Sequence, residues 1–344
     1  MNSKDERQHY VSKVLLKRFK IPSNPLQCYQ IQTGLWEPKS IERSCSAPGY
    51  NQLLAGGNPN NAIEDSFSRV ETNLPRTFRA LELAANQSST DLSKELYENL
   101  CSYCTFLKGT SLFSKPGAVV SFLAQINLEL ERGENYLLRE LQVADSQVDI
   151  FRKGFLQGGR IIIQSENVLQ TVFRLQFERM LNPNYSEFVN CEWTISNSPI
   201  DLPMSDIGLI KISLTDLKAN QYLLPIGPRL LLEGLFYYEA AKNSSKPVVH
   251  GHNLSAEEAE YRLDCICSSA VLEVICPHKN FDVIASRDRA RAKQITFTKI
   301  VNPEKVLVAG LQSANPAYCL QMVSIDDYVK FVHSFVRPPN FEMK

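Results

Sequence analysis

Apolar residues recur at helical spacing close to the start of the chain. Ser3 and Glu6 stand three residues apart, as in a capping box, and predict a helix from there to about Lys20, before the first prolines. On a helical wheel the apolar side chains of this stretch share one arc, and Arg18 falls inside that arc. Because an arginine keeps its charge, Arg18 needs either a route to water or a carboxylate partner.

A second apolar stripe extends from Ala62 to Leu83 and predicts a longer helix. Glu64 and Glu71 lie side by side on the edge of this stripe, and their spacing of seven residues places them about 10 Å apart along the helix axis. That separation is too large for the two carboxyl groups to act as an acid–base pair on one bond, or to share one metal ion. Further helices are expected over 91–113, 117–131, 146–155 and 168–181.

The pattern changes after Pro183, where segments rich in β-branched and aromatic residues alternate with turn signals. This pattern predicts strands over 192–200, 209–214, 221–224 and 230–235, and then a helix over 255–274. The remaining expected elements are a β-hairpin over 27–47, a loop over 51–61, strands over 295–301, 306–309 and 318–323, and a helix over 326–336.

These elements together predict an α+β fold, in which a helical N-terminal and middle region packs on a mainly antiparallel C-terminal sheet. We expect a mainly helical lobe over residues 1–182, which includes the N-terminal β-hairpin, and an α+β lobe over residues 183–344. The two lobes are expected to form one continuous unit.

Charge and cysteine content limit the setting in which the protein works. The 344 residues include 37 Lys or Arg and 37 Asp or Glu, so composition gives no argument for a general binder of nucleic acid or membranes. No stretch has the pattern of a signal peptide or a membrane span. The nine cysteines are an odd number in a chain too long to need disulfides, which favours reduced thiols. We therefore expect a cytoplasmic protein.

Two short motifs contain residue types that bind metal ions, but each has a structural interpretation that we favour. Cys101 and Cys104 form a CxxC inside a predicted helix, and no second CxxC follows at zinc-site spacing. His250 and His252 are expected to lie in a loop, where polar residues usually serve solubility.

A third group, Cys265, Cys267, Cys276 and His278, is closer to a zinc-binding pattern. Cys265 and Cys267 are two positions apart on a predicted helix, however, so their side chains diverge and cannot share an ion without distorting the helix. We expect no metal ion and no cofactor.

The strongest basic run lies between Arg287 and Lys293 and includes Arg289 and Arg291. Asp288 interrupts it, which favours a solvated face, and we expect nucleic acid to bind only if this run contacts phosphates. The G-x-S-x-G, GxxxxGK[ST], HExxH and GxGxxG patterns are absent, so the common enzyme classes that carry them are not expected.

The segment His9-Tyr10-Val11, followed by Leu16-Lys17-Arg18-Phe19, resembles the HYVPxxxLRxF opening of a large microbial family, domain of unknown function 4238 (DUF4238). Three later segments occur in the same order as in that family and are similar to its E-N-x-x-S-x-x-E, T-S-D-N-P-V and F-P-L-S-P segments. In this chain they are Asn61-Ala62-Ile63-Glu64 with Glu71, Ile195-Ser196-Asn197-Ser198-Pro199-Ile200, and Leu224-Pro225-Ile226-Gly227-Pro228. The resemblance implies no established reaction.

The chain departs from the family pattern at several positions. Ser12 replaces the usual proline, Lys17 the usual arginine, and 108–110 a common Arg-Thr-Pro. Asn197 stands where the family usually has aspartate. If that aspartate is a base or a metal ligand, this chain has lost it, because an amide neither takes up a proton nor carries charge. If it only shapes a turn, asparagine serves as well.

Two functions follow, and the sequence leaves open whether the protein is an enzyme. In the first, a non-catalytic or degenerate member uses these residues as a buried polar cluster that joins three segments. Arg18 would then pair with Glu64 or Glu71, and His9 with Asn197. We favour this function because of Asn197.

In the alternative, the protein is a hydrolase or a nuclease-like enzyme. His9 would act as general acid or base, and Glu64 or Glu71 would orient it. Lys17 or Arg18 would hold an anionic group. Under either function we expect His9, Arg18, Glu64, Glu71 and Asn197 to converge, with Tyr10, Lys17, Arg18 and Ser196 as binding residues.

Overall fold

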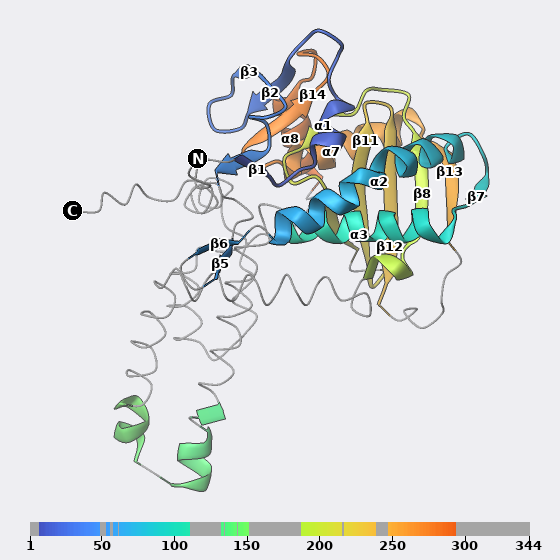
Figure 1. The fold of residues 1–344 in the computed structure, drawn as a ribbon. Coiled ribbons are helices and arrows are strands. Elements are labelled where there is room, and N and C mark those ends of the chain that lie inside the picture. The colour runs from blue at the N-terminus through green and yellow to red at the C-terminus, as the bar shows by residue number, and fades with distance from the viewer. Residues whose placement is uncertain are drawn as a thin grey trace. The chain divides into compact units, whose positions relative to one another are not determined.

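The computed structural model describes residues 7–48, 53–55, 58–60, 62–110, 132–133, 135–142, 144–150, 187–214, 217–238 and 247–293. The chain forms two compact units. The first comprises Met1–Leu112 and Arg179–Thr298, and the second comprises Phe113–Glu178 and Lys299–Lys344. Most of the described residues belong to the first unit (Figure 1).

A six-stranded sheet forms the centre of the first unit. Its strands, in order across the sheet, are β10 (Ile210–Leu214), β11 (Ala219–Gly227), β12 (Leu230–Tyr237), β8 (Glu192–Asn197), β13 (Val248–Asn253) and β7 (Ser89–Asp91). Neighbouring strands are antiparallel except for β8 and β13, which are parallel. The expected antiparallel strands after Pro183 are confirmed, and the chain has an α+β fold.

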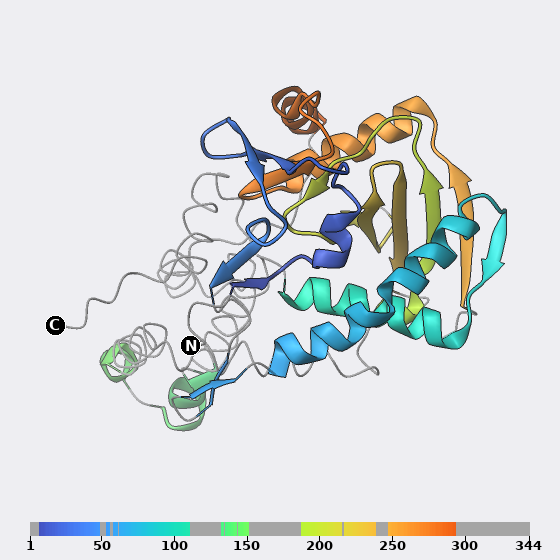
Figure 2. The same ribbon diagram turned by 45° about the horizontal axis from the view of Figure 1, so that its top comes forward.

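Helices cover both faces of this sheet, as Figures 1 and 2 show. α2 (Ala62–Ala84) and α3 (Lys94–Thr110) lie side by side along one face, and α7 (Ala256–Ser269) lies on the other. The apolar side chains of α7 pack against β10, β11 and β12, and this core includes Leu223 and Leu231. The helices expected over 62–83 and 91–113 are confirmed as α2 and α3, whose apolar stripes face the sheet and each other. Asp91, expected at the start of the second helix, belongs instead to β7, and 111–113 lie outside the described residues.

A second sheet has four antiparallel strands, in the order β3 (Trp36–Lys39), β2 (Leu26–Gln30), β14 (Glu273–Cys276) and β9 (Met204–Ser205). The fully buried carboxylate of Asp206, directly after β9, accepts hydrogen bonds of 2.6–3.0 Å from the backbone N–H groups of Val271, Leu272 and Glu273. Burial raises the pKa of Asp206 to about 6. Asp206 thereby holds the turn that leads into β14.

The expected N-terminal helix is wrong over most of its length. Residues Arg7–His9 form β1, which pairs with β4 (Ser46–Pro48), and the helix is limited to α1 (Lys13–Lys17). The side chain of Ser12 accepts a hydrogen bond from the backbone N–H of Val14 and caps α1. The pairing of β1 with a strand almost 40 residues away overrides the local helical pattern.

Three further expectations need correction. His250 and His252, expected in a loop, lie on β13, because this segment pairs with β8. The helix expected over 255–274 ends at Ser269, and β14 follows it because its residues complete the second sheet. The loop expected over 51–61 contains β5 (Leu53–Ala55) and β6 (Asn58–Asn60), which pair with each other. The hairpin expected over 27–47 is confirmed by β2 and β3.

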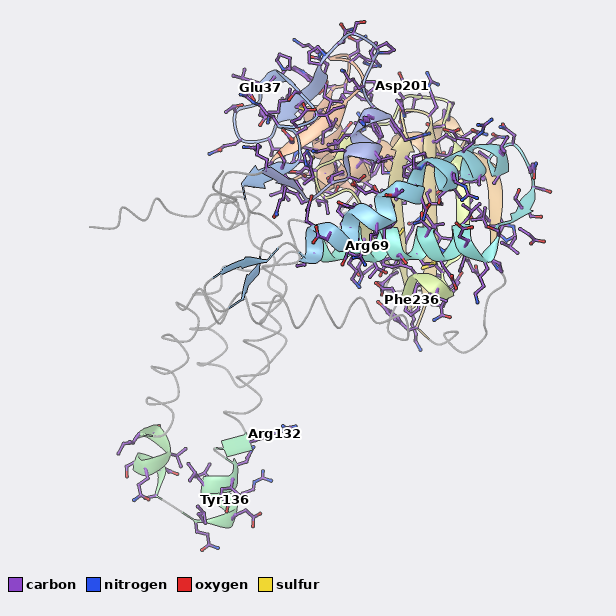
Figure 3. All side chains as sticks on the ribbon, in the orientation of Figure 1. Glu37, Arg69, Arg132, Tyr136, Asp201 and Phe236 are labelled. Carbon is purple, nitrogen blue, oxygen red and sulfur yellow. The ribbon has the colours of Figure 1, made fainter. Side chains whose placement is uncertain are left out.

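Several expected elements lie wholly or partly outside the described residues: the helices over 117–131, 146–155, 168–181 and 326–336, and the strands over 295–301, 306–309 and 318–323. In the second unit, Tyr136–Glu140 forms a π-helical turn, and Figure 3 labels Arg132 and Tyr136 there. In the ranges that the structure describes, no helix has the length and apolar character needed to cross a membrane.

Candidate functional site

Arg18 joins three segments of the first unit. It follows α1 directly, donates from Nε to the backbone carbonyl of Ile226 at the end of β11, and donates from Nη2 to the carboxylate of Glu82 on α2. Its guanidinium also lies over the ring of Phe78, with Cζ 5.2 Å from the ring centroid. Arg18 therefore pairs with Glu82, and the expected pairing with Glu64 or Glu71 is wrong.

Glu82 was not identified from the sequence, although a signal for it existed. It lies eleven residues after Glu71 and eighteen after Glu64, and both spacings correspond closely to whole turns of an α-helix. The three glutamates therefore share one edge of the α2 stripe. Only the tertiary structure selects Glu82 as the partner of Arg18, because Glu82 is the carboxylate level with the end of β11.

Asn197 binds Ala85, the residue directly after α2, at the opposite end of this helix from Glu64. It is the last residue of β8, and its Nδ2 donates to the backbone carbonyl of Ala85 at 3.0 Å and to Oδ1 of Asn253 at 3.1 Å. Ala85 follows Glu82 by three residues, so Arg18 and Asn197 both hold the C-terminal end of α2. We call Arg18 and Asn197, with these partners, the α2 clamp.

A polar hollow of about 510 Å³ lies beside Asn197. Its lining residues come from the segment directly after α2 and from β13: Ala85, Asn86, Gln87, Ser88, Gly251, His252 and Asn253. Both hydrogen-bond acceptors of Asn197, Ala85 and Asn253, belong to this lining. Asn197 therefore fixes the spacing between the two walls of the hollow.

His9 is buried on β1, with 5 % of its surface exposed. Its Nε2 lies 2.9 Å from the backbone carbonyl of Ile41, so Nε2 carries the proton in that hydrogen bond. Burial lowers the pKa of His9 to about 4, and the contact with Ile41 only partly offsets this effect. The expected contact of His9 with Asn197 is wrong, since Asn197 bonds to Ala85 and Asn253.

Glu71 of α2 is half-buried beside the N-terminal end of α1. Its carboxylate faces the hydroxyl of Ser12 and the backbone N–H of Lys13, and both stabilise the ionised form, as does the charge of Lys17. Burial outweighs these contacts and raises the pKa of Glu71. The structure thus brings Glu71 to the HYV-like segment, but through Ser12 and not through His9.

Tyr103 of α3 adds a buried hydroxyl to this group. The hydroxyl lies close to Ser12 and Glu71 but makes no hydrogen bond of normal geometry with a described residue. Burial raises the pKa of Tyr103 well above its ordinary value, and the charge of Glu71 raises it further. Tyr103 therefore remains a neutral phenol beside Glu71.

The remaining candidates lie at different places in the first unit. Tyr10 is buried, donates its backbone N–H to Cys45 and accepts a hydrogen bond from Thr110 at its carbonyl. Lys17 is exposed at the end of α1, and Glu64 is half-buried in the first turn of α2.

Ser196 is fully buried on the α7 face of the sheet and lies 3.2 Å from Glu233 on β12. Glu233 also accepts hydrogen bonds of 2.9 Å from Gln221 and Arg262. All partners of Glu233 lie between the sheet and α7, so Ser196 belongs to a buried ion-pair network and not to the hollow.

The cysteine motifs have the character of core thiols. The eight described cysteines are free and buried, and Cys319 lies outside the described residues. Burial raises the pKa of Cys101, Cys265 and Cys267 to about 12, which keeps them protonated and unreactive. Within the described ranges, no group of three or more His, Cys, Asp or Glu side chains is arranged to hold a metal ion.

His278 has a partner that the sequence did not indicate. Its Nε2 lies 2.9 Å from the carboxylate of Asp201, which Figure 3 labels and which also binds Arg229. The other ring nitrogen of His278 accepts a hydrogen bond from the backbone N–H of Asn280. Both ring nitrogens are therefore engaged, and neither is placed to act as a base.

The basic run lies on α8 (Val283–Ala292) and just after it, and its charges have partners within the fold. Arg287 is buried and donates to the carbonyls of Cys267 and Ala270. The other three cations are in ion pairs: Arg289 and Lys293 bind the buried Asp264, and Arg291 binds Asp288. Each cation of the run thus has a partner within the protein, so its charge needs no phosphate ligand to balance it.

Comparison with known proteins gives one match. The sequence profile of the DUF4238 family, described as proteins of unknown function, matches residues 7–248. No curated protein and no solved structure matches the chain. The matched range covers well over half of the chain and includes all four of the family-like segments. The protein is therefore a member of the DUF4238 family, whose function is unknown.

Proposed function

We propose that this chain is a non-catalytic binding or scaffold member of its family, in which the family-like residues hold α2 on the sheet. The observation that carries the proposal is the donor role of Asn197, whose amide nitrogen donates both of its hydrogen bonds. The carbonyl of Ala85 can only accept, so this position requires a donor. A carboxylate here would face that carbonyl as a second acceptor.

The geometry of His9 argues against an enzyme built on this histidine. Its ring is buried, and Nε2 already donates to the carbonyl of Ile41. A general acid or base must reach the proton of a bound substrate, either directly or through one water molecule. A pKa of about 4 also leaves His9 uncharged at neutral pH and unable to act as an acid there.

One observation favours the alternative of a hydrolytic enzyme. Glu71 is half-buried, its pKa is raised by burial, and it lies beside the hydroxyls of Ser12 and Tyr103. Carboxyl groups with raised pKa values are typical of acid–base catalysts, although structural groups show such values as well. In this alternative Glu71, and not His9, is the acid or base.

We also propose a cytoplasmic setting in a microbial cell. The buried, unpaired cysteines support reducing surroundings, and the family resemblance supports the microbial source. Oxidation of the purified protein with a mild disulfide-forming agent should leave these thiols titratable after unfolding.

The change Asn197→Asp tests the proposal, with Asn24→Asp as the matched control. Asn24 is an exposed asparagine whose side chain has no hydrogen-bond partner among the described residues. Asn197→Asp loses two donors and places a charge near the C-terminal end of α2, where the helix dipole is unfavourable for anions. We expect a loss of about 2 kcal/mol in unfolding free energy, or ~5 °C in melting temperature, and no change for the control.

Activity measurements on the same proteins complete the test. Wild type and Asn197→Asp would be assayed on chromogenic esters, a chromogenic phosphodiester, and single- and double-stranded nucleic acids. We expect no hydrolysis above the background of the Asn24→Asp control. If Asn197→Asp gains hydrolytic activity without losing stability, and a further Glu71→Gln change abolishes that activity, the alternative replaces this proposal.

A further inference from the structure

The polar hollow beside Asn197 is built on a close approach of two backbones. A Cβ atom added at Gly251 would lie 1.9 Å from the carbonyl oxygen of Gln87 and 2.5 Å from that of Ala84. Only glycine therefore lets the segment after α2 rest on β13. The backbone N–H of Gly251 donates to the carbonyl of Ser88 and ties the two walls together.

Asn197, a member of the α2 clamp, holds the same two walls of the hollow together. Asn197 bridges Ala85 on one wall and Asn253 on the other. Figures 1 and 2 show the end of α2 beside β13 and β7 at the edge of the six-stranded sheet. The hollow is therefore pre-formed, so a ligand need not order these segments when it binds.

Three amide side chains in the lining are oriented by contacts that use only part of their hydrogen-bonding capacity. Asn86 donates to the carbonyl of Glu82, which leaves its oxygen as an acceptor. Gln87 accepts from Thr90, and Asn253 accepts from Asn197, so both keep their amide N–H groups as donors. Within the described part of the chain, these remaining groups have no partner.

The chemistry of the lining is unfavourable for two ligand classes. No Lys, Arg, Asp or Glu side chain lines the hollow, so a charged ligand would lose hydration without gaining a counter-charge. The single ionisable lining residue, His252, has Glu258 3.7 Å from its Nε2. An apolar ligand would cover the amide groups without hydrogen-bonding to them, which is equally unfavourable.

We infer that the hollow binds a neutral, hydroxyl-rich small molecule of the sugar class, through the amide groups of Asn86, Gln87 and Asn253. A hydroxyl group both donates and accepts, so adjacent hydroxyls match a set of fixed amide donors and one amide acceptor. The volume of about 510 Å³ lies within the range of small-molecule sites. This inference rests on the proposed binding function and adds the site and the ligand class.

The change Gln87→Glu tests the inference with little change in shape. Glutamate keeps an oxygen to accept from Thr90 but replaces the amide donors with a second acceptor. Asn24→Asp again serves as the control for the added charge. Saturation-transfer NMR would measure binding of glucose, N-acetylglucosamine and trehalose to the full chain, with glucose 6-phosphate as the anionic probe and cyclohexanol as the apolar probe.

We expect at least one neutral sugar to bind wild type and Asn24→Asp equally, and to bind Gln87→Glu about tenfold more weakly. Glucose 6-phosphate and cyclohexanol should bind more weakly than the sugars. The inference fails if no neutral sugar binds at concentrations up to ~10 mM, if Gln87→Glu binds as well as wild type, or if the phosphate improves binding. None of these results bears on hydrolysis by Asn197→Asp, so this failure is distinct from failure of the proposed function.

Discussion

Replacing Arg18 with methionine removes the guanidinium of the α2 clamp but keeps an unbranched side chain that can still pack over Phe78. The change leaves the carbonyl of Ile226 without its charged donor and Glu82 without its ion-pair partner. A hydrogen bond from a charged group contributes about 1.5–3 kcal/mol. The ion pair contributes less than about 1 kcal/mol, because Glu82 is 41 % exposed and solvent screens it.

The cation–π contact with Phe78 adds about 0.5–1 kcal/mol. All three interactions use the same guanidinium, so their effects do not add in full. We expect Arg18→Met to lower the unfolding free energy by about 2–3 kcal/mol. Arg18→Lys should lower it by about 1–2 kcal/mol, because one ammonium group does not reproduce the planar fork that reaches two acceptors at once.

Urea denaturation followed by circular dichroism measures these losses as shifts in midpoint at constant slope. Lys20→Met is the matched control, because Lys20 is exposed and its side chain has no partner among the described residues. The control should lie within ~0.5 kcal/mol of wild type. If Arg18→Met is as stable as Lys20→Met, the α2 clamp does not stabilise the fold and the reasoning is refuted.

Two further predictions concern pH. The folded pKa of His9 is about 4, below its unfolded value, so unfolding becomes more favourable as the pH falls from 6.5 toward 4. Wild type should therefore lose about 2 kcal/mol more than His9→Gln between pH 7 and pH 5, as measured by urea titration, and parallel losses would contradict the burial of this ring. The pKa of Glu71 is raised in the folded state, so its favourable contribution is present at low pH and is lost as the pH rises through the folded value. Thermal melts should therefore show Glu71→Gln gaining on wild type between pH 4 and pH 7, and a difference that does not vary with pH would count against the raised pKa.

The local sequence pattern was sufficient to predict an element where that element buries one continuous stripe of apolar side chains. The apolar positions of α2 repeat at helical spacing over 23 residues, and the helix buries them in the core. The strands β8, β10, β11 and β12 after Pro183 were also predicted, because short turns join most of them and their β-branched and aromatic residues mark them locally. β13 and β14 in the same region were missed. Recognition of the DUF4238 segments likewise needed only their order along the chain.

Only the tertiary structure determined which segments that are distant in the sequence pair with each other. Residues Arg7–His9 have a helical pattern but form β1, because β4 offers backbone hydrogen bonds that a local pattern cannot reveal. The turn between α7 and β14 likewise depends on a distant residue, because Asp206 accepts its backbone hydrogen bonds.

In the α2 clamp, too, some features followed from the sequence and others only from the tertiary structure. Sequence predicted that Arg18 would need a partner, since its charge falls on an apolar arc. It did not predict which carboxylate, because three glutamates share the edge of α2 and only the position of β11 selects Glu82. The donor role of Asn197 was equally invisible, because it depends on where the carbonyl of Ala85 lies when α2 packs on the sheet.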